Sequence, residues 1–164
     1  MGILSEDMQR VVREQRLGFV ATVCPDGTPN LSPKGTLTVW DDDHLVFADI
    51  RSPATLRNLR INPALEINVV DPIVRKGYRF KGKATVVDRG PLRDDIRDFY
   101  ASRWIDTGKS VGELELRSFV LIKVEQALAL VSPSYDDPRA TEEEIRAAWW
   151  KHHQGLQPKT KTRR

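Results

Sequence analysis

The chain has few of the residues that cross-link a fold or bind metals. Its 164 residues include one cysteine, Cys24, and three histidines. A single cysteine forms no internal disulfide, which fits the reducing cytoplasm; near a strand end, Cys24 is interpreted as a small buried hydrophobic residue. The cysteine and the histidines show no metal-ligand spacing, so no metal is expected.

Long apolar runs and nucleotide loops are also missing. No apolar run approaches the roughly 20 residues that a membrane-spanning helix needs, and the start, Met1–Asp7, is too acidic and polar for a signal peptide. Neither a P-loop nor a dinucleotide-binding glycine motif is present. These absences predict a cytoplasmic protein with no membrane partner.

Charge of one sign is concentrated only at the end of the chain. The net charge is +3, and Lys159, Lys161, Arg163 and Arg164 supply four of the positive charges. The rest is close to neutral, so nucleic acid is not expected as a partner. The length and the 40% hydrophobic share predict one domain over residues 1–156, followed by a disordered basic tail at 157–164.

Periodicity and turn signals predict mostly antiparallel strands with helices at the ends and at one crossover. The predicted strands are Gly18–Cys24, Thr28–Lys34, Thr36–Trp40, His44–Ala48, Ala64–Val70, Gly77–Val87 and Ser118–Val131. The predicted helices are Ser5–Arg16, Ser52–Ile61, a segment that begins at Pro91 and a last one that begins at Thr141, where Glu144 completes a capping box. Asp41–Asp43 is interpreted as a solvated turn rather than a metal site.

Two neighbouring segments predict a phosphate site. One strand ends at Lys34, and the strand His44–Ala48 runs into a helix start that carries Ser52 and nearby arginines. Unpaired N–H groups at a helix N-terminus, a capping hydroxyl and cations all favour an anion. We therefore expect a phosphorylated ligand.

The order of several short motifs resembles a known family. Phe19–Thr22 leads to Asp26–Pro29, a hairpin leads to Leu45–Asp49, and Leu56–Leu59 is followed by Asn62–Pro63. Between about Leu17 and Val87 this pattern is similar to the pyridoxamine 5′-phosphate oxidase-like, FMN-binding split-barrel family. The resemblance implies a six-stranded antiparallel split β-barrel with peripheral helices. It also implies a homodimer that holds FMN in two clefts at its interface.

The resemblance also implies which residues bind the cofactor. By position, the phosphate candidates are Lys34, Arg51, Ser52, Thr55 and Arg57, and the candidates for the ribityl chain or ring edges are Ser32, Asp49 and Asn58. Arg79, on the strand segment Gly77–Gly82, is expected to reach the cofactor of the partner subunit.

The residues themselves leave simpler roles open. Ser52 could be a plain N-cap before Pro53, and Lys34 could extend its charge to solvent from a strand edge. Arg57 could lie on an exposed helix face, and Arg79 could pair with a carboxylate. Trp149 and Trp150 could pack in the core or an interface, or one of them could cover the partner's cleft.

The chain also departs from the oxidases that give the family its name. Ser52-Pro53-Ala54-Thr55 replaces their Ser-Arg-Lys turn, and no counterpart of their substrate-binding arginine segment is found in Thr141–Arg164. Oxidation of pyridoxamine phosphate is therefore not expected. The predicted function is an FMN-dependent oxidoreductase that passes electrons between a reduced nicotinamide or similar donor and an unknown small substrate.

Two kinds of alternative stay open at this point. The chain could bind a deazaflavin or haem in the same fold, although only His44 of the three histidines lies in the matching half. It could also be a non-catalytic flavin-binding or sensor protein.

Overall fold

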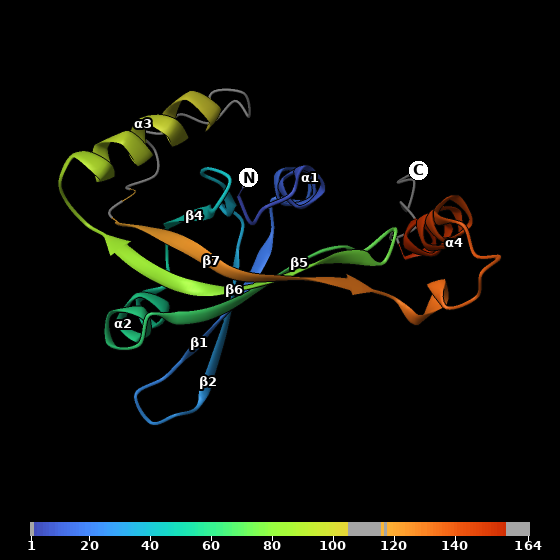
Figure 1. Cartoon of the computed structure of the whole chain (residues 1–164), viewed down its shortest axis with the longest axis horizontal. Coiled ribbons are helices and arrows are strands. Elements are labelled where there is room, and N and C mark those ends of the chain that lie inside the picture. Colours follow the sequence, from blue (N-terminus) through green and yellow to red (C-terminus); the bar gives the residue numbers. More distant parts are fainter. Residues whose placement is uncertain (1, 105–115, 117, 157–164) are drawn as a thin grey trace, which may run out of the picture.

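The protein folds around one strongly curled antiparallel sheet. A computed structural model describes residues 2–104, 116 and 118–156 (Figure 1). Seven strands follow the spatial order β2-β1-β5-β6-β7-β4-β3, and neighbouring strands pair antiparallel. They are β1 (Gly18–Val23), β2 (Pro29–Lys34), β3 (Thr38–Val39), β4 (His44–Asp49), β5 (Ala64–Asp71), β6 (Lys76–Val87) and β7 (Ser118–Val131).

The expected split barrel is confirmed, with seven strands in place of the six expected. The extra strand, β3, has two residues, although the sequence predicted a strand over Thr36–Trp40. Thr36 lies outside the ladder because its hydroxyl, rather than its backbone, binds Ala48 on β4. The expected basic tail, 157–164, lies outside the described residues.

Four helices and one short 3₁₀ turn of the described residues surround the sheet. They are α1 (Glu6–Gln15), α2 (Pro53–Ile61), α3 (Pro91–Trp104), η3 (Pro133–Tyr135) and α4 (Glu142–Gly155). In Figure 1, α3 and α2 lie at one end of the long β6–β7 ribbon, and η3 and α4 lie at the other. No helix among the described residues is long and apolar enough to cross a lipid bilayer.

Two hydrophobic clusters hold these elements together. The larger one joins α1 and α2 to the sheet, with Phe47, Ile67 and Phe80 fully buried at its centre. The smaller one lies under α3, where Ile96 and Tyr100 pack against Phe119. Because β4 contributes to both clusters, its position depends on both α2 and α3.

The acidic turn between β3 and β4 binds the N-terminal segment. The Leu4 N–H donates to the carbonyl of Asp42 at 2.9 Å, and the Ile3 N–H donates to Asp43 Oδ1 at 2.8 Å. The Asp43 N–H donates to Asp41 Oδ1 at 2.8 Å, as the turn prediction required. The three carboxylates thus fix the turn and the approach to α1. No group of three or more potential metal ligands occurs in the described part of the chain.

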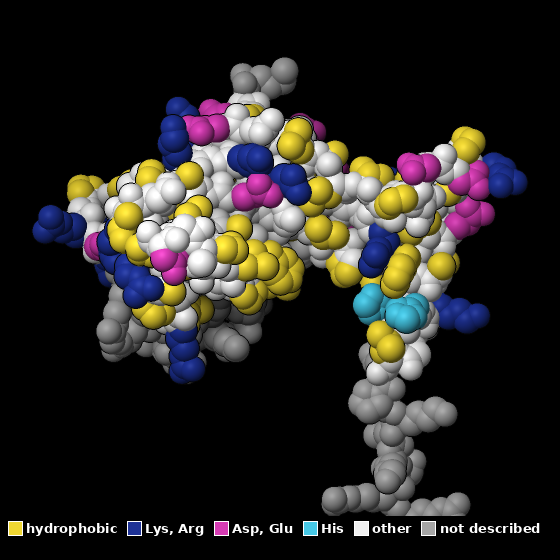
Figure 2. Space-filling view, turned by 90° about the horizontal axis from the view of Figure 1, so that it is seen from below, with side chains coloured by type: hydrophobic (Ala, Val, Ile, Leu, Met, Phe, Trp, Pro, Cys, Tyr) yellow, Lys and Arg dark blue, Asp and Glu magenta, His cyan; other side chains and the backbone are white. Residues whose placement is uncertain are grey.

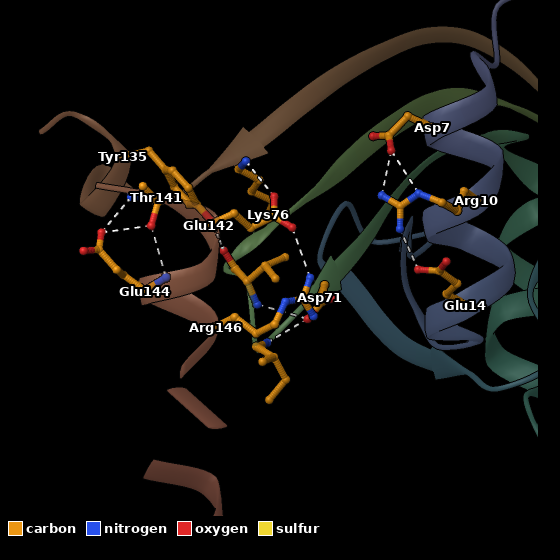
Figure 3. Close-up of polar contacts among 12 residues, drawn as sticks. Asp7, Arg10, Glu14, Asp71, Lys76, Tyr135, Thr141, Glu142, Glu144 and Arg146 are labelled. Carbon is orange, nitrogen blue, oxygen red and sulfur yellow. Dashed lines mark hydrogen bonds and ion pairs between the residues drawn. The ribbon is translucent and has the colours of Figure 1, made fainter. Parts of the chain in front are cut away.

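The last helix is anchored to the β5–β6 hairpin by charge and by an aromatic contact. The predicted capping box is confirmed, because the Thr141 hydroxyl accepts from the Glu144 N–H and the Thr141 N–H donates to the Glu144 carboxylate. Lys76 Nζ lies 3.0 Å from the carboxylate of Glu142, as Figure 3 shows. The Arg75 guanidinium lies 4.1 Å from the centre of the Trp149 ring. This contact makes Trp149 part of the packing of α4.

Candidate functional site

The candidate site lies where the sheet is split. Strand β2 is at one end of the strand order and β4–β3 is at the other, so these two edges do not share a ladder. Between them is a cavity of about 320 Å³. Its lining consists of Ser32, Pro33, Lys34, Gly35 and Thr36 from the end of β2 and the turn after it, and Ala48, Ile50, Arg51 and Ser52 from the end of β4 and the loop to α2.

Lys34 is a buried cation on this cavity. Its side chain is on the inner face of β2, and the residue is only 5% exposed. The ammonium donates to the Ser32 hydroxyl at 2.5 Å and lies 5.6 Å from the centre of the Phe47 ring. Among the described residues, no carboxylate lies within ion-pairing distance of it. Burial lowers the pKa of the Lys34 ammonium, and the charge of Asp49 opposes that change.

A buried cation without a carboxylate partner is costly to keep. An anion that enters the cavity would remove this cost, because the ammonium would gain a charge-assisted hydrogen bond. The alternative in which Lys34 extends to solvent from a strand edge is therefore wrong. Its placement fits a phosphate group.

The loop between β4 and α2 forms the opposite wall. Its fold depends on Asp49, whose Oδ1 accepts from the Ser52 N–H at 3.0 Å and from the Ser52 hydroxyl. Ser52 occupies the N-cap position of α2, but its side chain makes no capping hydrogen bond. The serine cap expected from the sequence is therefore wrong. Asp49 holds the hydroxyl instead, and no side chain at the N-cap blocks the first N–H groups of α2.

Beneath this wall, α2 buries a small polar network against β1 and β2. Asn58 Nδ2 donates to the Thr22 hydroxyl at 3.1 Å and contacts Cys24 Sγ at 3.5 Å. Asn30 Nδ2 donates to the same Thr22 hydroxyl at 3.0 Å and reaches the Thr55 hydroxyl at 3.5 Å. Asn58 Oδ1 is buried without a protein partner. Cys24 is half-buried and contacts this network rather than lying in the apolar core.

The structure brings together only part of the predicted site. Ser32, Lys34, Arg51 and Ser52 line the cavity, and Asp49 holds its loop in place. Thr55 and Asn58 are fully buried in the network under the first turns of α2, and neither lines the cavity. Arg57 lies on the exposed face of α2 and does not line the cavity, as the simpler alternative predicted.

Arg79 lies elsewhere in the protomer, on the outer face of β6. Its Nε is 2.9 Å from Glu66 Oε1, close enough for an ion pair but without the alignment of a hydrogen bond. The carboxylate partner considered from the sequence is thus present within the chain. A role for Arg79 toward the partner subunit stays a prediction.

Two residues of the site were missed from the sequence. Asn30 shares the inner face of β2 with Ser32 and Lys34, and the two-residue period of a strand could have identified it. Thr36 follows Lys34 and binds Ala48 through its hydroxyl, with 2.8 Å to the carbonyl and 3.1 Å to the N–H. The hairpin around Asp41–Asp43 places Thr36 opposite Ala48, but no sequence pattern indicates that its hydroxyl makes the bonds in place of its backbone.

A second cavity, of about 350 Å³, lies between α1, the β6–β7 ribbon and α4. Figure 3 shows the charged residues that line this cavity, and each of their cations forms an ion pair with a carboxylate. Arg10 lies 2.6 Å from Asp7 and 2.7 Å from Glu14, and Glu142 lies 3.0 Å from both Lys76 and Arg146. These cations are neutralised already, so the second cavity has little attraction for a phosphate.

One face of the sheet is not covered by any described helix. Phe19, Leu31 and Leu128 are 45%, 65% and 42% exposed on the outer side of β1, β2 and β7. Figure 2 shows hydrophobic side chains gathered on this underside, next to the lobe that α4 forms. These three side chains thus expose apolar surface on the outer face of the sheet.

The comparisons with known proteins agree with this architecture. The family model described as "Pyridoxamine 5'-phosphate oxidase" matches residues 4–130. The chain belongs to this family. No curated protein sequence matches the chain.

Solved structures of several family-like proteins share the fold. HupZ from Group A Streptococcus is 28% identical over 78% of this chain and 94% of that chain, with a TM-score of 0.65. An FMN-binding protein from Syntrophomonas wolfei is 16% identical over 79% of this chain and 87% of its own, with a TM-score of 0.63. The haem storage protein HutZ from Vibrio cholerae is 22% identical over 80% of this chain and 95% of its own, with a TM-score of 0.60.

Proposed function

We propose that this family member is an FMN-binding oxidoreductase that acts on a small molecule as a cytoplasmic homodimer. The observation that carries the proposal is Lys34, a buried cation with no carboxylate partner among the described residues, on a cavity that also contains Arg51 and the Ser52 hydroxyl. FMN ends in a phosphate with nearly two negative charges, and the Lys34 and Arg51 cations suit it.

The donor set supports FMN over a cofactor without phosphate. Lys34 and Arg51 would hold the phosphate, together with the N-terminal N–H groups of α2. Ile50, Pro33 and Ala48 supply apolar surface in the same cavity. When bound, the flavin ring itself accepts and donates hydride, so the protein needs no catalytic triad.

The same geometry argues against haem in this cavity. His44 is the one histidine that the family-like half contains, and its Nδ1 lies 2.8 Å from Asp41 at the β3–β4 turn. It does not line the cavity between β2 and β4. The site therefore offers no imidazole among its lining residues to bind an iron atom.

The exposed apolar sheet face supports the homodimer. An area that contains Phe19, Leu31 and Leu128 is unfavourable in water, and a second copy would cover it. Arg79 is on this face, so the pairing would bring it towards the partner, as the family resemblance implies.

The proposal is tested by the absorption spectrum of the purified protein, followed by denaturation and identification of the released compound. We expect flavin bands and FMN in the supernatant. Reduction of the bound flavin by a nicotinamide donor would support the oxidoreductase, and failure to be reduced by any donor would favour a non-catalytic binding protein. A colourless protein that takes up no added FMN would overturn the proposal, as would the release of a deazaflavin or haem.

A further inference from the structure

A hydrogen-bonded clamp fastens the turn after β2 to strand β4, beside the candidate site. The Thr36 hydroxyl donates to the Ala48 carbonyl at 2.8 Å and accepts from the Ala48 N–H at 3.1 Å. These are the two bonds that a neighbouring strand would make with Ala48 in an antiparallel ladder. A side chain therefore takes the place of a backbone partner at this point.

Helix α3 reinforces the same contact from outside the cavity. The Tyr100 hydroxyl lies 2.7 Å from the Thr36 carbonyl and 3.1 Å from the Val46 carbonyl, so one side chain bridges the turn after β2 and strand β4. The Tyr100 ring stacks on Phe119 of β7, with the centroids 5.7 Å apart. Thr36, Ala48 and Tyr100 are all buried, which excludes water as a competing partner.

The position of the clamp relates it to the phosphate site. Thr36 is two residues after Lys34, and Ala48 directly precedes Asp49, which holds the Ser52 loop. The clamp thus joins the segment that carries Lys34 to strand β4, which leads into the loop on the opposite wall of the cavity. Thr36 lies opposite Ala48 in the register of the β3–β4 ladder, so the clamp extends that ladder towards β2.

We propose that Thr36 and Tyr100 are positioning residues that set the separation of Lys34 and the β4–α2 loop and so pre-organise the phosphate site. This inference rests on the proposed FMN function. Tyr100 does not line the cavity, so it acts on the ligand only through Thr36 and β4. Helix α3, remote from the cofactor, becomes part of the binding apparatus.

The test measures FMN affinity in three clamp variants. Thr36→Val keeps the shape of the side chain but removes both bonds to Ala48, and we expect FMN to bind about tenfold more weakly. Tyr100→Phe keeps the stacked ring and removes the hydroxyl, with an expected loss of about fivefold. Thr36→Ser keeps the hydroxyl and should bind FMN nearly as the wild type does.

A matched control separates positioning from a general loss of stability. Ile67→Val removes one buried methylene from the core of β5, away from the cavity, and should lower the unfolding temperature without changing FMN affinity. If Thr36→Val and Tyr100→Phe bind FMN as tightly as the wild type, the inference is overturned. The same holds if Ile67→Val weakens FMN binding as much as they do.

A second measurement keeps the inference testable without the cofactor. Hydrogen exchange of the Ala48 N–H should be slow in the flavin-free wild type and faster in Thr36→Val. Wild-type protein that binds no FMN would overturn the proposed function. If the protein binds no FMN but the Ala48 N–H still exchanges faster in Thr36→Val than in the wild type, the clamp between Thr36 and β4 is supported on its own. If the Ala48 N–H exchanges equally fast in both proteins, the clamp is overturned as well.

Discussion

Two of the cavities among the described residues are of similar size, but their charges are organised in opposite ways. In the cavity between α1 and α4, Arg10, Lys76 and Arg146 each lie within 3.0 Å of a carboxylate. In the cavity at the split, Lys34 is more deeply buried and has a hydroxyl, not a carboxylate, as its polar partner. The number of charges is therefore a poor guide to an anion site. A cation that the fold has buried and left without an opposite charge is a better one.

The largest expected effect comes from removing that cation. Lys34→Met should weaken FMN binding by about two orders of magnitude, because a buried charge-assisted contact with the phosphate is lost. The flavin-free protein should keep or gain stability, since an unpaired buried charge is removed. Titration of flavin fluorescence and thermal unfolding measure the two effects.

The matched control for this variant is in the other cavity. Lys76→Met removes a cation that already has Glu142 as its partner, so FMN affinity should not change. Equal losses in Lys34→Met and Lys76→Met would show that both variants act through overall charge, against the comparison of the cavities.

The pH dependence of FMN affinity should show a smaller effect. Burial lowers the pKa of Lys34, so its ammonium loses the proton at a lower pH than an exposed lysine does. FMN affinity should then fall by about tenfold as the pH rises through that lowered pKa, below the ordinary value of about 10.4. Affinity that stays constant up to the range of an exposed lysine would contradict this assignment.

The stability of the flavin-free protein should change in the opposite direction. Between the lowered pKa and the ordinary one, the unfolded chain binds more protons at Lys34 than the folded chain does. Stability without FMN therefore rises with pH in this range, and urea unfolding at several pH values measures it. In Lys34→Met this part of the rise should disappear.

The hydroxyl of Ser52 should contribute less than Lys34. Ser52→Ala removes the hydroxyl that donates to Asp49 and helps to fix the loop on the cavity wall, and we expect FMN to bind about fivefold more weakly. Thr141→Ala removes a comparable hydroxyl from the capping box of α4. That variant should lose about 1 kcal/mol of stability, with FMN affinity unchanged. An equal loss of affinity in both variants would show that Ser52 acts only through folding.

The smallest effect is expected from the ion pairs that surround the second cavity. Glu142→Gln weakens the contacts with Lys76 and Arg146, all of which are partly exposed. Exposed pairs of this kind contribute about 0–1 kcal/mol, so the unfolding temperature should change little. A large loss of stability would show that this charge network anchors α4 more strongly than its exposure indicates.

Local patterns predicted the elements of the fold well. The capping box at Thr141, the strand Ser118–Val131 and the helix over the segment after Ser52 all appear near their expected bounds. Each of these signals lies within a few residues of the structure that it specifies. Lys34 and Ser52 were placed at one site because each ends a strand or begins a helix, and the fold brings those ends together.

Long-range contacts explain what the sequence could not predict. The Ser52 hydroxyl was expected to cap α2, but it donates a hydrogen bond to Asp49 instead and makes no capping bond. Thr36 was interpreted as the start of a strand, and it lies opposite Ala48 in the β3–β4 register, but its hydroxyl replaces its backbone in that contact. Its contact with Tyr100 spans 64 residues of sequence and could not be predicted locally. The sequence did not indicate whether Arg57 lies on the face of α2 towards the cavity or on the face towards solvent.

The central claim is that the split holds a phosphate beside Lys34. The most direct test compares the affinity of the flavin-free protein for FMN and for riboflavin, which share the ring and ribityl chain and differ only in the phosphate. We expect FMN to bind about 100-fold more tightly than riboflavin, and Lys34→Met to remove most of that preference. Equal affinity for the two compounds, or a preference that Lys34→Met leaves unchanged, would contradict the account.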